Sequence, residues 1–387
     1  MKLLRLLFLP FAFLIVGVIR LIHPWRIVRF GEIIAFRIGH LIGNTECYLC
    51  ERDSGMYPNT YDIWARNGEI SNKLIDKKYA RHLRIWPREI ARIVILVNNL
   101  FSGWNKHIVR SAQADRDIYN LWRFYAPHIG LTEREERKGE ELLNELGIPL
   151  GSEWVCLIVR DSAYLKEKLP QLDYSYHDYR DSKIEDYVLA VLELLKRGYY
   201  VIRMGEIVEK PFPVQHERFI DYSLNGRTEF GDLYLGAKCA FCLGTSCGFM
   251  AIPQVFDRPV GIVNFVPVEY ISTWVKGIVI WKHHMKDGKE MTLKEIKEAE
   301  LSQTTFGHDF AKAQVELKDN TPQEILEVAI EMANISEGRG IESQKEFWED
   351  FPRGMAGDKP LHGEIKIRIG REFLRNYENI SGNRLPS

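Results

Sequence analysis

The chain has 387 residues, and its 52 lysines and arginines nearly balance 53 aspartates and glutamates, for a net charge of −1. A hydrophobic fraction of 45% is typical of a packed globular protein and excludes intrinsic disorder, while the lack of a basic excess argues against a dedicated nucleic-acid binder. Six cysteines are too few for a disulfide framework, which favours a reducing compartment, and the length predicts two domains.

The N-terminus is apolar, with basic residues at both of its ends. Its charge-free run from Leu6 to Ile19 is shorter than the roughly 20 residues that a bilayer-spanning helix needs. No small-residue cleavage site follows, which counts against a cleaved signal peptide. We expect residues 1–26 to form a membrane-associating helix that lies in an anionic leaflet, with Trp25 at its boundary. A spanning helix over residues 3–22 and a cleaved signal peptide remain alternatives.

Residues 27–147 are predicted to form a Rossmann-like domain. An apolar strand, a turn at Gly39 and a helix are the opening of many such domains. Residues 90–100 are apolar enough for either a strand or a helix. Thr132 and Glu135 form a capping box, which predicts a charged amphipathic helix just before the domain boundary.

The second half alternates short apolar runs of strand length with helices. Strands that are apolar along their whole length predict a parallel sheet covered by helices on both faces. We expect this second Rossmann-like domain to span residues 148–334 and to be followed by a helical tail over residues 335–387. The predicted strands cover residues 153–159, 199–205, 217–223, 238–244 and 258–265.

Polar residues follow these strands where they end, which is where open parallel sheets bind ligands. The most specific group is Gly244-Thr245-Ser246-Cys247-Gly248. Its glycines allow close backbone approach, its hydroxyls offer hydrogen-bond donors, and a following helix would present free N–H groups, all of which suit an anion. Arg160, Arg180 and Arg203 would add charge-assisted bonds to a diphosphate, each contributing about 1.5–3 kcal/mol.

The same pentapeptide matches the G-x-S-x-G nucleophile elbow of α/β-hydrolases, with Ser246 as the nucleophile. Asp257 and one of His283, His284 or His308 would complete a Ser–Asp–His triad in the required order. A serine hydrolase leaves the arginines and the whole first half of the chain unexplained, so we keep it as the alternative function.

Metal and cofactor motifs are weak. There is no Walker sequence and no G-x-G-x-x-G, which disfavours a kinase or a dehydrogenase. The C-x-x-C pairs Cys47–Cys50 and Cys239–Cys242 are better explained as small buried thiols than as zinc ligands. We therefore expect no bound metal and no cofactor.

A transferase that inverts an anomeric centre needs a base to take the proton of the acceptor. His40 has the right chemistry and lies at the first strand–helix turn, where a ligand would bind. Glu46 and Asp53 are the substitutes for this role.

Three segments, at residues 37–53, 198–206 and 219–267, resemble a bacterial glycosyltransferase family associated with cell-surface polysaccharide synthesis. The resemblance extends over most of residues 27–275. It implies an α/β fold of GT-B type, in which two Rossmann-like domains face each other across a cleft, with the donor in the second and the acceptor in the first. The motif positions that it carries over are Arg37, Gly39, His40, Arg203, Gly205, Asp232, Gly244, Ser246, Gly248 and Pro259.

Together these observations predict a metal-independent glycosyltransferase at the cytoplasmic face of the cell membrane. It would move a sugar from a nucleotide-sugar donor to a surface-glycan or lipid-linked acceptor, with His40, Glu46 or Asp53 taking the proton. The predicted donor-binding residues are Arg160, Arg180, Arg203, Gly205, Glu206, Gly244, Thr245, Ser246 and Gly248.

Overall fold

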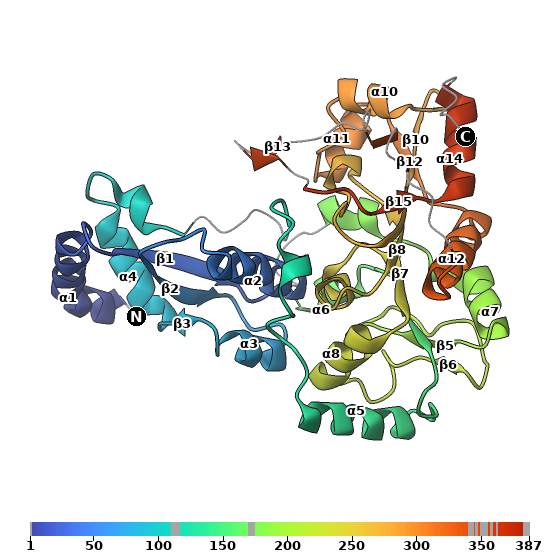
Figure 1. The fold of residues 1–387 in the computed structure, drawn as a ribbon. Helices are drawn as coiled ribbons and strands as arrows, with labels where there is room; N and C mark the ends of the chain where they lie inside the picture. Colours follow the sequence, from blue (N-terminus) through green and yellow to red (C-terminus); the bar gives the residue numbers. More distant parts are fainter. Residues whose placement is uncertain are drawn as a thin grey trace. The chain divides into compact units, whose positions relative to one another are not determined.

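The computed structural model describes residues 2–109, 117–168, 175–339, 344, 347–348, 355–356, 359–360 and 363–381. Contacts along the chain separate it into two compact units (Figure 1). The first comprises Met1–Asp117 and Leu121–Gly130, and the second comprises Ile118–Asn120 and Leu131–Ser387. The charged helix predicted at the end of the first domain is present with its capping box, and it belongs to the second unit.

The first unit is built on a three-stranded parallel sheet in the order β1-β2-β3. β1 pairs with β2 along its whole length. The segment that sequence left open between strand and helix, residues 90–100, is helical up to Asn98, where α4 ends. The elements are α1 (Lys2–Leu21), β1 (Ile27–Ile34), α2 (Ile38–Asp53), β2 (Thr60–Asn67), α3 (Lys73–Tyr79), β3 (Arg84–Ile85), α4 (Arg88–Asn98), η1 (Trp104–His107) and η2 (Trp122–Phe124).

Different helices cover the two faces of this sheet, because neighbouring side chains of a strand point to opposite sides. Val28 and Phe30 of β1 are buried in one cluster with α1 and α4. On the other face Arg29 pairs with Asp62 at 2.6 Å, and the hydroxyl of Tyr48 on α2 donates to the same carboxylate at 2.6 Å. α2, which carries three predicted site residues, therefore lies on the face opposite α1.

α1 contributes to the core of the first unit. Its residues Ala12, Val16 and Ile19 are buried against the sheet and α4. Leu14 and Val18 on its other side stay 67% and 51% exposed. Among the helices that the structure describes, none combines the length and the apolar character needed to cross a membrane.

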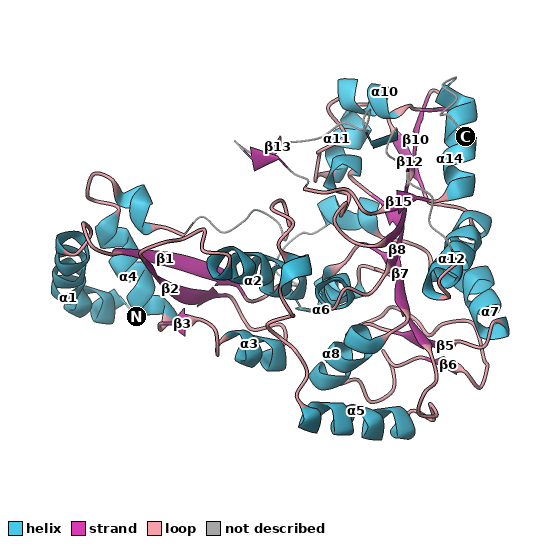
Figure 2. Cartoon of the chain, in the orientation of Figure 1, coloured by secondary structure: helices cyan, strands magenta, loops and turns pink. Residues whose placement is uncertain are grey.

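The second unit contains a seven-stranded parallel sheet in the order β15-β9-β8-β7-β4-β5-β6 (Figure 2). Figure 1 shows α7 and α12, which pack against each other, on one side of this sheet and α8 on the other. The sheet and the elements that precede its last strand are α5 (Glu133–Glu145), β4 (Trp154–Ile158), α6 (Ala163–Lys168), η3 (Ser175–Arg180), η4 (Ile184–Tyr187), α7 (Val188–Lys196), β5 (Tyr200–Arg203), β6 (Phe219–Ile220), α8 (Glu229–Lys238), β7 (Phe241–Thr245), η5 (Gly248–Met250), α9 (Ala251–Val255), β8 (Val260–Phe265), η6 (Val268–Tyr270) and β9 (Gly277–Trp281).

The remaining elements of this unit follow β9 in the sequence. They are β10 (His283–Lys286), β11 (Lys289–Glu290), α10 (Leu293–Glu298), α11 (Gly307–Lys312), β12 (Glu316–Lys318), α12 (Pro322–Ser336), β13 (Met355–Ala356), β14 (Lys359–Pro360), β15 (Arg368–Ile369) and α14 (Arg371–Ser381). β10, β11 and β12 form a separate antiparallel sheet.

The prediction of an α/β fold with parallel sheets is confirmed. All five strands expected in the second half are present as β4 to β8, and each is shorter than predicted. α8 continues to Lys238, so Cys239 precedes β7 instead of lying in a strand with Cys242. The segment predicted as a helical tail also supplies β15, which pairs with β9 at the edge of the sheet.

Candidate functional site

The large sheet reverses its strand order between β4 and β7. From β4 the chain adds β5 and β6 on one side, and it then returns to place β7, β8 and β9 on the other. Open α/β sheets bind ligands at such a switch point, outside the carboxyl ends of the strands. The segments that leave β4 and β7 here begin with Val159-Arg160 and Ser246-Cys247, so the switch point coincides with the predicted donor site.

Gly244 brings the end of β7 close to β4. Its φ is +147°, and a Cβ at this position would lie 1.7 Å from the carbonyl oxygen of Ile158, so only glycine fits. Thr245 is 1% exposed, and its hydroxyl accepts a hydrogen bond from the N–H of Arg160 at 2.8 Å. Thr245 thus fixes the start of the loop after β4 to the end of β7, which is a structural role in addition to its predicted role in donor binding.

Two of the three predicted arginines lie at this turn. Arg180 donates from Nη2 to the carbonyl oxygen of Ser246 at 3.0 Å. Nη1 of Arg160 lies 3.5 Å from Oδ1 of Asp181, a carboxyl group whose pKa burial raises to about 6. Burial raises the pKa of the Cys247 thiol, and the charges of Arg160 and Arg180 act against this rise. The structure therefore places the guanidinium group of Arg180 at Ser246 and fixes the backbone of Arg160 to the same turn through Thr245.

The helix expected after the turn is short. Gly248 begins a three-residue 3-10 helix, and α9 behind it has five residues. The dipole of so short a helix is small, because it sums over few aligned peptide units. The attraction for an anion at this turn must therefore come mainly from the arginines.

Arg203 lies apart from the turn, as the last residue of β5. Its side chain is 1% exposed, and Nη1 donates to the carbonyl oxygen of Lys210 at 2.7 Å and to Oδ2 of Asp221 at 3.0 Å. The same carboxylate oxygen accepts the N–H of Phe212 at 3.1 Å. These contacts give Arg203 a structural role. From the sequence, Arg203 is predicted to lie beside Ser246 in the donor site, but the structure holds its guanidinium at Lys210 and Asp221 instead.

Gly205 and Glu206 also belong to this neighbouring region. Gly205 has a φ of +148°, and a Cβ there would lie 2.9 Å from Cγ1 of Val208. Oε2 of Glu206 lies 3.5 Å from Nη2 of Arg227, which also pairs with Asp232 at 2.6 Å. The predicted donor residues therefore fall into two groups, one after β4 and β7 and the other after β5.

A cavity of about 130 Å³ lies at the carboxyl ends of β4 and β5. Pockets for small-molecule ligands have volumes of about 300–1,000 Å³, so this one is too small for a nucleoside diphosphate. Positive and negative side chains line it in equal number: Lys183, Arg203, Lys210, Asp161, Glu185 and Glu209.

Ser246 does not belong to a catalytic triad in the described part of the chain. Its predicted partners interact elsewhere: Asp257 with Lys276, His283 with Glu290 and Glu324, His284 with the carbonyl group of Lys282, and His308 with Asp309. A serine hydrolase requires a histidine within hydrogen-bonding reach of the nucleophile. These contacts therefore remove the support for the hydrolase alternative.

In the first unit, α2 holds Glu46 and Asp53 against one histidine, His128. Glu46 is 3% exposed, accepts the hydroxyl of Tyr79 at 2.9 Å and lies 2.9 Å from Nδ1 of His128. Nε2 of His128 lies 3.0 Å from Oδ2 of Asp53. Burial acts to lower the pKa of His128, but the two carboxylates outweigh it and raise this pKa overall. The carboxylate of Glu46 is therefore buried away from solvent, whereas the side chain of Asp53 is 32% exposed.

His40 lies apart from this cluster. It precedes Glu46 by six residues on the same helix, a rotation of about 240° around the helix axis. It is half-buried, and its Nδ1 lies 3.4 Å from Oδ1 of Asn44. His40 also stands in the first turn of α2, directly beyond the carboxyl end of β1. Of the three predicted bases, it has the position that best suits contact with a ligand.

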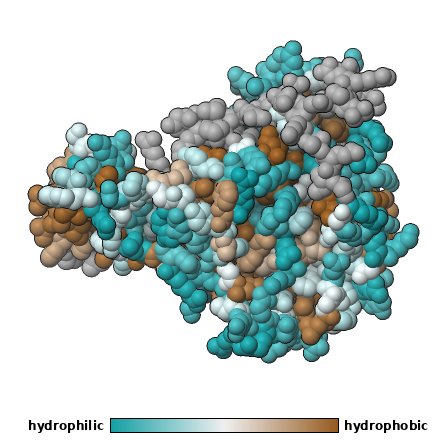
Figure 3. All heavy atoms as spheres, in the orientation of Figure 1, coloured by the Kyte–Doolittle hydropathy of each residue, from teal (hydrophilic) through white to brown (hydrophobic). Residues whose placement is uncertain are grey.

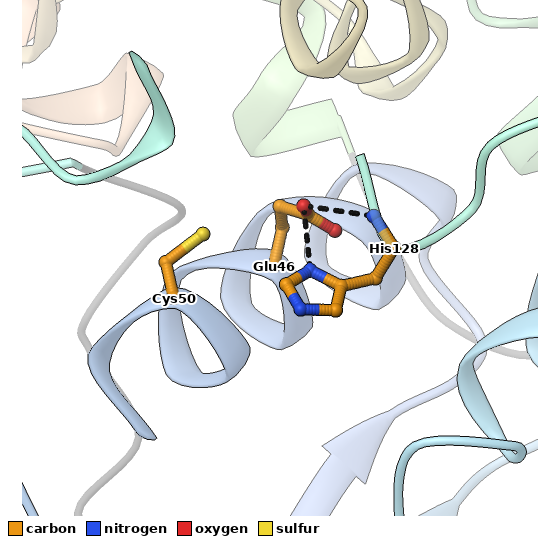
Figure 4. Close-up of side chains that lie close together, drawn as sticks. All are labelled: Glu46, Cys50 and His128. Atoms are coloured by element: carbon orange, nitrogen blue, oxygen red, sulfur yellow. Dashed lines mark hydrogen bonds and ion pairs between the residues drawn. The ribbon is translucent and has the colours of Figure 1, made fainter. Parts of the chain in front are cut away.

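Glu46, Cys50 and His128 are the one group in the described residues with the spacing for a metal ion (Figure 4). Their donor atoms lie within 4.8 Å of one another. Figure 4 shows that Nδ1 and the backbone N–H of His128 both approach Glu46, so this pair is satisfied without an ion. Burial raises the pKa of the Cys50 thiol, whereas a metal needs the thiolate. We interpret the group as a buried ion pair.

His128 is the site residue that sequence analysis missed. It follows Glu46 by 82 positions and Asp53 by 75, and it belongs to no motif. The one indication in the sequence is that Glu46 and Asp53 are seven residues apart and therefore lie on the same face of α2, where a cation could pair with both.

No protein-family model matches the chain, and no curated protein matches it either. Among solved structures, it is similar to the ADP-heptose lps heptosyltransferase II of Escherichia coli, with 11% sequence identity and a TM-score of 0.45 over 80% of this chain and 100% of that one. It is also similar to a family 9 glycosyl transferase from Veillonella parvula DSM 2008, with 10% identity and a TM-score of 0.41 over 80% and 97% of the two chains. These similarities are distant, so we base the function on the geometry of the site.

Proposed function

We propose that the chain is a glycosyltransferase that binds a nucleotide-sugar donor at the carboxyl ends of β4 and β7. The observation that carries this proposal is the pair Arg160 and Arg180 at a glycine turn on the switch point of a parallel sheet. Sugar transfer releases a nucleoside diphosphate as the leaving group, and negative charge develops on this group in the transition state. Positioned cations that stabilise such a charge usually make the largest contribution to catalysis.

A GT-B-like arrangement suits this chemistry. It needs two α/β domains with parallel sheets, and each unit of the chain contains one. The donor site lies in the second unit, and the first would hold a surface-glycan or lipid-linked acceptor at the cytoplasmic face of the membrane. The reaction needs no metal in this proposal, because the arginines provide the positive charge.

His40 would take the proton of the acceptor hydroxyl. It is a half-buried imidazole in the first turn of α2, and general bases need this partial access to the reacting group. Asp53 is the remaining substitute, since its side chain is still partly exposed. Glu46 is withdrawn from this role, because its carboxylate is buried and shared with Tyr79 and His128.

Binding of ADP, UDP and GDP, measured by isothermal titration calorimetry, tests the donor site. We expect one of these diphosphates to bind the wild-type chain. Arg180→Ala should weaken that binding at least about tenfold, since each charge-assisted bond contributes about 1.5–3 kcal/mol. Arg160→Ala should weaken it similarly.

Arg197→Ala is the matched control. Arg197 follows α7 at the amino end of β5 and pairs with Glu193 at 2.8 Å, so its loss should leave diphosphate affinity unchanged. Failure of all three diphosphates to bind, or equal losses in Arg180→Ala and Arg197→Ala, would contradict the proposed site.

A further inference from the structure

One side of α1 is buried in the first unit, and the opposite side is exposed although it is equally apolar. The buried side is formed by Ala12, Val16 and Ile19. The exposed residues recur every three or four positions and therefore form a single stripe along the helix. They are Phe11, Leu14, Val18 and Leu21, which are 60%, 67%, 51% and 72% exposed.

The segment after α4 extends this stripe. The rings of Phe13 and Phe101 lie 6.3 Å apart in an edge-on arrangement. Nη1 of Arg20 donates to the carbonyl oxygen of Ser102 at 2.8 Å, and its guanidinium lies 4.9 Å from the ring centroid of Phe101. We define the apolar face as the exposed residues of both segments, which are Phe11, Phe13, Leu14, Val18, Leu21, Leu100, Phe101 and Trp104. Figure 3 shows hydrophobic atoms gathered where α1 lies.

The two segments that carry the apolar face contain basic residues and no acidic ones. Residues 1–31 and 96–109 contain no aspartate or glutamate. Arg26 and Lys106 are exposed, and Trp25 beside Arg26 is 74% exposed. Tryptophan and basic residues are the side chains that proteins place at the boundary between lipid and water.

This combination fits an anionic lipid surface better than a second copy of the chain. Two copies meeting through the apolar face would bring two basic rims together, and like charges oppose such an interface. A bilayer with anionic headgroups accepts the apolar side chains in its outer acyl region and pairs with the cations at its surface.

We propose that the apolar face docks the first unit onto the surface of an anionic phospholipid bilayer, with α1 lying in the plane of the interface. α1 is held to the unit by its buried side and presents the other side to lipid. This inference is independent of the proposed transferase activity, because none of its residues belongs to the donor site.

Co-sedimentation of the full chain with vesicles tests the inference. We expect binding to vesicles of phosphatidylcholine with phosphatidylglycerol, weaker binding to phosphatidylcholine alone, and a decrease at high salt as the charges are screened. The triple variant Leu14→Ser/Val18→Ser/Leu21→Ser should lower the partition coefficient at least about tenfold, because each side chain loses the apolar area that it buries in lipid.

The matched control is Leu150→Ser/Leu189→Ser/Leu192→Ser, which removes three leucines of the second unit that are 67%, 44% and 46% exposed. It should bind vesicles as the wild type does. The double variant Leu100→Ser/Trp104→Ser, whose substitutions lie outside α1, should also lose vesicle binding. It replaces the triple variant in the test if the triple variant proves to be unfolded. Undiminished vesicle binding by the folded variants would overturn the inference. The inference would also be overturned if the wild type self-associated without binding vesicles and the triple variant abolished this self-association.

Discussion

His283 illustrates how two carboxylates can fix the charge of one side chain. Its Nδ1 lies 2.7 Å from Glu290, and its Nε2 lies 3.1 Å from Glu324, which also caps the first turn of α12. Burial acts to lower the pKa of His283, but the two glutamates outweigh it and raise this pKa to about 10. The imidazole is therefore charged at neutral pH and joins β10, β11 and α12 through ion pairs.

This raised pKa predicts a stability that depends on pH. A group that binds its proton more tightly when folded stabilises fully below its ordinary pKa of 6.5 and loses that contribution as pH rises towards 10. We expect the difference in unfolding free energy between wild type and His283→Gln to reach a few kcal/mol at pH 6 and to shrink steadily above pH 6.5. Urea denaturation across this range measures it, and a difference that stays constant up to pH 10 would refute this interpretation of the ion pairs.

The predictability of the site residues follows from how local their partners are. The positions of Gly244 and Ser246 at the end of a strand could be predicted because the strand precedes them directly in the sequence. Arg203 shares its strand-end position with Arg160, yet its guanidinium is taken up by Asp221, 18 positions away. His128 could not be assigned at all, since its partners are 75 and 82 positions away.

At the scale of elements, the contact between β4 and β7 depends on one glycine. An alanine at Gly244 would have to adopt a φ of +147° and displace the carbonyl group of Ile158. We expect Gly244→Ala to lower the unfolding free energy by at least about 2 kcal/mol and to weaken diphosphate binding. Gly226→Ala is the control, since Gly226 also has a positive φ, of +71°, but no atom within 4 Å of the new Cβ. Calorimetric melting of both variants tests this expectation, and equal losses would contradict it.

The alternation of strands and helices was predictable, whereas the edges of the sheet were not. β4 to β8 are continuous apolar runs between helices, and this pattern has few other solutions. β15 has two residues and is a strand only because it pairs with β9, about 90 positions earlier in the chain. α1 was predicted as a separate segment, because sequence does not show that Ala12 and Val16 pack against α4 and β1.

At the scale of the whole molecule, the net charge of −1 conceals strong local differences. Acidic residues are absent from residues 1–31 and 96–109, the two segments that contain the apolar face. The side chain of Arg180 and the backbone N–H of Arg160 come from separate segments, and both contact Thr245–Ser246 at the end of β7. The overall composition argues against a dedicated nucleic-acid binder, but it does not locate the proposed donor and membrane sites, whose positions depend on the topology of each unit.

The central claim is that the carboxyl ends of β4 and β7 hold a diphosphate. A crystal structure of the chain with a bound nucleoside diphosphate tests it most directly. We predict that the phosphates lie against Ser246–Gly248, within hydrogen-bonding distance of the guanidinium groups of Arg160 and Arg180. A diphosphate bound at the opposite edge of the sheet, or in the first unit alone, would contradict the claim.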